Sequence, residues 1–75
     1  MKCVREWHDH RAGIHVGTFE YQREGRTMYA VISECSGDQE VTLRTTNRPE
    51  ASWEHERLVA FYRDQCASGS TREGS

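Results

Sequence analysis

The chain has 75 residues, with ten basic and twelve acidic side chains and a formal net charge of −2. This length allows one domain with a small core, because so short a chain buries only about 60% of its unfolded surface. The mixed charge lacks the basic stripe of a non-specific nucleic-acid binder, and no apolar run approaches the roughly 20 residues of a membrane span.

The first ten residues, MKCVREWHDH, contain no apolar segment of the kind found in a secretory signal. The cysteine count of three is odd, unlike the even sets of secreted disulfide scaffolds. We therefore expect a cytoplasmic protein, located in the host cytoplasm if it is phage-encoded. In that reducing compartment Cys3, Cys35 and Cys66 should stay as thiols.

Segments rich in β-branched and aromatic residues predict antiparallel strands, and tight turns separate them. The turns REGR and SGDQ contain Gly25 and Gly37, which supply the positive φ that short hairpin turns need. The N-terminal segment alternates only weakly, and it would pair through the turn DHRAG as a fourth strand. The predicted strands are Ile14–Gln22, Thr27–Cys35 and Glu40–Thr46, with Lys2–His8 as the fourth candidate.

The segment after the strands predicts an amphipathic helix from Pro49 to Cys66, with Asn47 or Ser52 as the N-cap. Its apolar stripe consists of Ala51, His55, Leu58, Tyr62 and Cys66. The polar residues 67–75 should form a disordered tail, which leaves residues 1–66 as the single domain. The expected fold class is α+β: a three- to four-stranded antiparallel β-meander with one C-terminal amphipathic helix packed on one face.

Alternation along the strands predicts which side chains face the helix. The expected core contains Met28, Ala30, Ile32, Val41, Leu43, Leu58, Phe61 and Tyr62. A β-bulge at Gly17 would place all four large apolar residues of the first strand, Ile14, Val16, Phe19 and Tyr21, on that same side. The open face would then carry Tyr29, Val31, Thr42 and Arg44. It is either a half-solvated sheet face or a contact surface, since Tyr and Arg are enriched in interface hot spots.

Trp53 has two interpretations. If the helix starts at Ser52, Trp53 folds over the sheet edge and caps the core, which is the interpretation that we prefer. If the helix starts at Pro49, Trp53 points away from the core and stacks on Arg57, forming an anchor for a partner.

The histidines and cysteines do not predict a metal site or a catalytic site. Cys3, His8, His10 and His15 give the spacing C-x4-H-x-H-x4-H, which matches none of the usual zinc motifs. We therefore expect no metal and no cofactor. If a metal did bind, these four residues would be its candidate ligands. Nothing fixes a Cys–His nucleophile, and His55 should lie at the edge of the core, bonded to a backbone carbonyl.

The sequence leaves three functional hypotheses. The first is a non-enzymatic protein that occupies the surface of a host protein or protein complex. It would be an inhibitor from a phage or mobile element that resembles anti-CRISPR proteins in size and architecture only. One small sheet with one helix rarely encloses the concave pocket of an enzyme. The expected binding residues are Tyr29, Val31, Arg44, Trp53 and Arg57.

The second hypothesis is DNA binding, because three strands backed by a helix resemble the DNA-reading domains of plant AP2 factors and the arm-binding domains of phage integrases. Arg11, Arg23, Arg26 and Arg44 would contribute, but Glu20, Glu34 and Glu40 lie among them. This hypothesis is therefore not favoured. The third is a homodimer formed through the open face or a sheet edge. None of the three involves a membrane.

Overall fold

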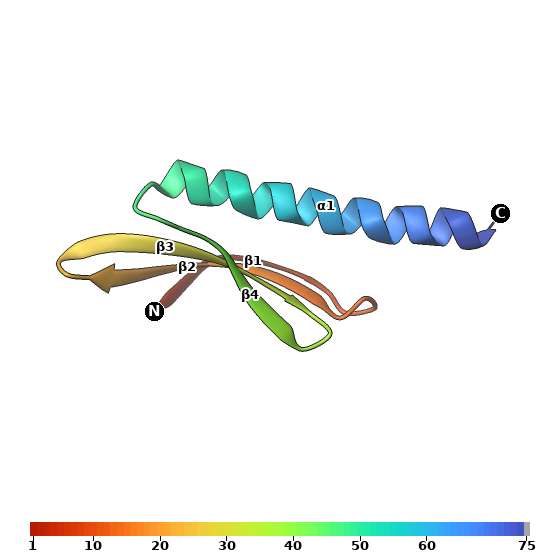
Figure 1. Ribbon diagram of the computed structural model, residues 1–75, viewed down its shortest axis with the longest axis horizontal. Helices are drawn as coiled ribbons and strands as arrows, with labels where there is room; N and C mark the ends of the chain where they lie inside the picture. Colours follow the sequence, from red (N-terminus) through yellow and green to blue (C-terminus); the bar gives the residue numbers. More distant parts are fainter. Residues whose placement is uncertain (75) are drawn as a thin grey trace.

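The protein is a four-stranded antiparallel sheet followed by one helix that packs against it (Figure 1). The computed structural model describes the backbone of residues 1–74 and the side chains of residues 1–65. The strands follow one another in the sheet in chain order. The elements are β1 (Lys2–Asp9), β2 (Ile14–Arg23), β3 (Arg26–Cys35), β4 (Asp38–Thr45) and α1 (Arg48–Gly74). The predicted α+β meander is confirmed, including the fourth strand.

Two-residue turns join β2 to β3 and β3 to β4. Glu24 and Gly25 have φ of 51° and 75°, and Ser36 and Gly37 have φ of 53° and 90°. Positive φ at both central positions matches the twist of the flanking strands, and glycine adopts it without a steric penalty. Both predicted turns are therefore confirmed.

The β1–β2 connection is a side-chain-stabilised turn. The Asp9 carboxylate accepts hydrogen bonds from the backbone N–H groups of Arg11 and Ala12, at 3.1 and 3.2 Å. Gly13 has φ of 67°, and its carbonyl accepts a hydrogen bond from the Ser36 N–H at 3.0 Å. The polar stretch DHRAG is thus ordered by Asp9 and is tied to the neighbouring β3–β4 turn.

The register of β2 against β3 is continuous from Ile14 to Arg23. The predicted bulge at Gly17 is therefore wrong. The register shifts lie in the edge strands, between Cys3 and Arg5 of β1 and at the Val31/Ile32 step opposite β4. Bulges concentrate at sheet edges, where an unpaired residue disrupts fewer ladder bonds.

Helix α1 begins at Arg48, earlier than Ser52. Asn47 is the N-cap, since its Oδ1 accepts the Glu50 N–H at 3.1 Å. The backbone stays helical to Gly74, past the predicted end at Cys66. Ser75, the last residue of the expected tail, lies outside the described residues, and the domain boundary at 66 stays a prediction. Over its described residues, α1 is too polar to cross a membrane.

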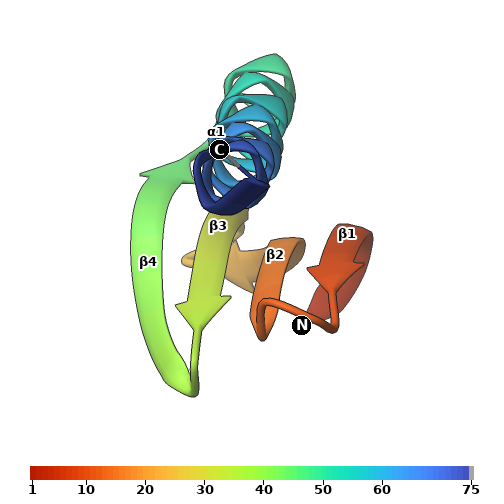
Figure 2. The same cartoon turned by 90° about the vertical axis from the view of Figure 1, so that its right-hand side faces the viewer.

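The core lies between α1 and the middle of the sheet, above β3 in Figure 2. It is formed by Val16, Tyr29, Val31, Ala51 and Leu58, with Trp7, Leu43, Val59 and Tyr62 packed around them. The predicted helix residues Leu58 and Tyr62 and the strand residue Leu43 are confirmed.

The predicted face of β3 is wrong. Tyr29 and Val31 point to the helix, so Met28, Ala30 and Ile32 lie on the other side, as does Val41 of β4. Phe61 is 51% exposed on the helix surface rather than in the core. Strand β3 is apolar on both faces, so alternation alone does not decide which face α1 covers.

Candidate functional site

The sheet face opposite α1 carries large apolar side chains. Residues paired across antiparallel strands point to the same face, and the pairs Phe19–Ala30, Tyr21–Met28 and Ile32–Val41 all lie on this one. We call it the open face. No element packs on it among the described residues, and most of its apolar side chains are half-buried or exposed. Its apolar members are Phe19, Tyr21, Met28, Ala30, Ile32 and Val41.

Gly17 lets the Phe19 ring lie close to the sheet. A Cβ atom on Gly17 would lie only 2.8 Å from Cε2 and 3.0 Å from Cζ of Phe19. The ring therefore occupies the space that a side chain at position 17 would fill. This contact, rather than a bulge, explains the glycine in the strand.

A shallow hollow of about 300 Å³ lies on the open face. Its lining combines the apolar residues Ala30, Ile32 and Val41 with the cationic residues Arg23 and Arg44. Met1 and Tyr21 complete the lining. Two cationic side chains beside an apolar lining fit an apolar group that has acidic neighbours.

The other end of the open face holds a cluster of two imidazoles and one carboxylate: Glu6, His8 and His15. Glu6 and His8 are two residues apart on β1, and His15 is the direct partner of His8 on β2. The Nε2 atoms of His8 and His15 lie 3.4 and 3.3 Å from the two Glu6 oxygens. These hydrogen bonds hold the pKa of the Glu6 carboxyl below its ordinary value. The two imidazole rings stack, with their centroids 4.2 Å apart.

Two further donor groups adjoin this cluster. The Cys3 Sγ lies 3.8 Å from Oε2 of Glu6, and the His10 ring stacks on His8 with a centroid distance of 5.4 Å. Of the four residues singled out from the sequence, Cys3, His8 and His15 therefore gather around Glu6, while His10 stands one ring further out.

A row of side chains one helical turn apart runs along the outer surface of α1: Trp53, Arg57 and Phe61. Trp53 is 65% exposed, with the Arg57 Cζ 6.0 Å from its ring centroid. Two hydrogen bonds of 2.8 and 3.0 Å hold the Arg57 guanidinium against the Glu54 carboxylate, and they keep the pKa of Glu54 below its ordinary value. The helix starts early, so the preferred placement of Trp53 over the sheet edge is wrong and the exposed alternative is confirmed.

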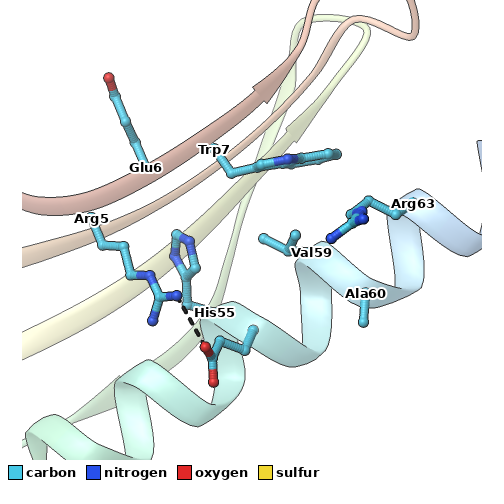
Figure 3. A pocket seen from close by; sticks show the side chains of 8 residues that line it. Arg5, Glu6, Trp7, His55, Val59, Ala60 and Arg63 are labelled. Carbon is cyan, nitrogen blue, oxygen red and sulfur yellow. Dashed lines mark hydrogen bonds and ion pairs between the residues drawn. The ribbon is translucent and has the colours of Figure 1, made fainter.

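A cleft of about 300 Å³ lies between β1 and the middle of α1. Figure 3 shows Trp7 above Val59 and Arg63, while Arg5 bridges to Glu56 across the cleft at 3.0 Å. Glu6 points to the opposite side of β1. The ion pair is exposed on both sides, which makes it a weak clamp. Strand β1 is therefore held in the fold mostly by its pairing with β2.

His55 is buried at the base of this cleft, with 2% exposure. Its Nδ1 lies 2.9 Å from the Thr18 hydroxyl, with which it shares a hydrogen bond. The expectation of a backbone carbonyl partner is therefore wrong. Burial lowers the pKa of His55 below its ordinary value, and the nearby Arg5 lowers it further.

Of the five binding residues predicted from the sequence, the structure buries two and exposes three. Tyr29 and Val31 are 8% and 0% exposed beneath α1, so they cannot form an open contact surface. Arg44 does lie on the open face, and Trp53 and Arg57 lie exposed on the helix. Cys3 and Cys35 are free and exposed thiols, whereas the prediction for Cys66 lies outside the described side chains.

Sequence reasoning missed the residues that form the open face and the carboxylate at the centre of the histidine cluster. Glu6 shares a face with His8 by simple alternation, and the pair Glu-x-His was the available signal. For the apolar residues, the Gly-x-Phe pattern of Gly17 and Phe19 is the only local indication that an aromatic ring crosses the uncovered face.

Comparisons with known proteins add no relative. No family model matches the chain, and no curated protein or solved structure shows significant similarity to it. The class that the geometry defines is a small open-faced α+β sheet domain, and its function has to be argued from its own surfaces.

Proposed function

We propose that the protein is a non-enzymatic binding module that docks, through the open face of its sheet, on a protein surface with an apolar centre and an acidic rim. The module would act by occupying that surface in a partner complex. The observation that carries the proposal is the hollow whose lining combines Ile32 and Val41 with Arg23 and Arg44.

The residue types of this surface support the proposal. Aromatic and arginine side chains dominate binding hot spots, and Phe19, Tyr21 and Arg44 meet on the open face. The strands hold these side chains in a fixed register, which lowers the ordering cost of association. Acidic groups on the partner would meet Arg23 and Arg44 and favour fast, salt-dependent association.

The test compares two surfaces with matched substitutions. The tagged full chain captures proteins from a bacterial lysate, and the partner recovered in stoichiometric amount is titrated against purified variants. Val41→Glu places a charge on the open face at a residue that is 41% exposed, and Phe61→Glu does the same on the helix at 51% exposure. We expect Val41→Glu to weaken binding at least about tenfold, while Phe61→Glu leaves it unchanged.

Three results would overturn the proposal. Loss of binding with Phe61→Glu but not with Val41→Glu would move the interface to the Trp53–Phe61 row. A concentration-dependent dimer in sedimentation, abolished by Val41→Glu and without a captured partner, would make a second copy the occupant. Binding of labelled DNA duplex at low salt would favour the DNA-reading alternative, because Arg23, Arg26 and Arg44 share the open face.

A further inference from the structure

We infer that Glu6, His8 and His15 form a zinc site that fastens β1 to β2. The three donor atoms lie within 4.8 Å of one another and come from two adjacent strands. Two imidazoles and one carboxylate are a ligand set that Zn²⁺ takes in proteins, with a fourth position left open. Mg²⁺ and Ca²⁺ prefer all-oxygen surroundings and do not fit this set.

Each imidazole lies at about a tetrahedral edge length from a Glu6 oxygen, but the two imidazoles contact different oxygens of that carboxylate. With metal–ligand bonds of about 2.0 Å, the edge of a tetrahedron between two N or O ligands is about 3.3 Å. The Nε2 atoms of His15 and His8 lie 3.3 and 3.4 Å from the Glu6 oxygens. The imidazoles stack nearly parallel, with an interplanar angle of 16°, so their lone pairs do not converge in this arrangement. Binding of one metal ion by both rings requires the two side chains to rotate.

Cys3 adjoins this cluster but lies outside the group of donor atoms that are all within 4.8 Å of one another, so it would have to move closer to serve as a fourth ligand. Its Sγ lies 3.8 Å from Oε2 of Glu6, whereas a thiolate and a carboxylate oxygen on one Zn²⁺ are about 3.5 Å apart, given Zn–S near 2.3 Å. The register shift between Cys3 and Arg5 sets where Cys3 stands along β1 relative to Glu6. The site is open to solvent, since the His8 and Glu6 side chains are 42% and 52% exposed, which gives the metal an entry path.

The position of the site suggests a structural role. Strand β1 is an edge strand of the sheet, and its exposed ion pair with the helix holds it weakly. Small domains often compensate for a limited core with a structural metal. A zinc ion bridging His8 and His15 would add a side-chain link between β1 and β2 to their backbone pairing.

The test is a zinc titration of the full chain, freed of metal with a chelator and read with a competing chromophoric indicator. We expect one Zn²⁺ per chain and no binding of Mg²⁺. Glu6→Gln, His8→Ala and His15→Ala should each weaken zinc binding at least about 100-fold, because changes in second-shell partners alone cost roughly 10- to 100-fold. His10→Ala and Glu40→Gln are the controls and should keep affinity within about threefold.

Two site-specific readouts complete the test. In the wild-type chain, zinc should shift the imidazole NMR signals of His8 and His15, leave that of His55 unmoved, and slow amide exchange in β1. A cobalt-loaded chain that loses a thiolate charge-transfer band on Cys3→Ser confirms Cys3 as the fourth ligand, and no such band in the wild type assigns that position to water. Equal losses with His10→Ala and His8→Ala, or unchanged affinity in folded cluster variants, would overturn the site.

Discussion

The buried pair Thr18–His55 offers the sharpest test of the core. The two residues are 3% and 2% exposed, and Thr18 Oγ1 lies 2.9 Å from His55 Nδ1. Thr18→Val keeps the shape but leaves Nδ1 without a partner, which costs about 1–3 kcal/mol. At about 0.05–0.15 kcal/mol per residue, the free energy of unfolding of a chain of this length is roughly 4–11 kcal/mol. The loss is therefore measurable and leaves the fold intact.

The same pair predicts how stability depends on pH. Burial lowers the pKa of His55 in the folded state below its ordinary value of 6.5, which the unfolded chain keeps. Between these two pKa values the unfolded chain binds more protons than the folded one, so the free energy of unfolding falls as the pH falls. Neutral His55 makes its full contribution to the free energy of unfolding above about pH 6.5. Between the two pKa values, each unit by which the pH falls lowers that free energy by at most about 1.4 kcal/mol.

The assay is urea unfolding at several pH values between about 5 and 8, above the range in which glutamates titrate. The double variant Thr18→Val/His55→Leu removes both polar partners, so it should recover most of the stability lost by Thr18→Val alone. It should also depend less on pH than the wild type. Thr46→Val, at an exposed position, is the control and should stay within about 0.5 kcal/mol of the wild type. A wild-type stability that does not change between pH 5 and 7, or a double variant that retains the full pH dependence, would refute the reasoning.

Predictions at three further positions concern the helix. Asn47→Ala removes the acceptor for the Glu50 N–H and should lower the free energy of unfolding by about 1 kcal/mol, whereas Asn47→Asp should retain stability, both measured by denaturant unfolding. Leu58→Ala should cost about 2–5 kcal/mol because Leu58 is 7% exposed in the core. Trp53→Ala, at 65% exposure, should change stability by less than about 0.5 kcal/mol. A large loss from Trp53→Ala would contradict the placement of Trp53 on the outer surface of α1.

The sequence predicts the element order well because the signals for turns and caps are local. Gly25 and Gly37 lie in two-residue loops that require positive φ, and Asn47 precedes an acidic first turn and caps it. Each of these positions is decided by the backbone within a few residues. The order of the four strands and the helix therefore follows from neighbours along the chain, whereas the choice between Asn47 and Ser52 as the N-cap did not.

The choice of covered face is a tertiary property that alternation does not determine. In β3, Tyr29 and Val31 lie on one face and Met28, Ala30 and Ile32 on the other. Both sets are apolar, so either face could be the one that the helix covers. The structure covers the first set, and it buries Thr18 and His55 beside it through a hydrogen bond that joins residues 37 positions apart. Alternation along β3 favoured Met28, Ala30 and Ile32 for the core, so the prediction placed the wrong set of β3 side chains under the helix.

This reversal bears on function. The helix covers a face that contains the buried polar residues Thr18 and Ser33, and it contributes Glu54 and His55. The open face meanwhile keeps Phe19, Tyr21 and Ile32 uncovered by any described element. Burial of these side chains against α1 would stabilise a small chain by about 25 cal/mol for each Å² removed from water. An uncovered apolar face also exposes the chain to aggregation unless something binds there. The helix covers Tyr29 and Trp7 but leaves Phe19 and Tyr21 on the open face, and this placement supports the docking role that we propose for that face.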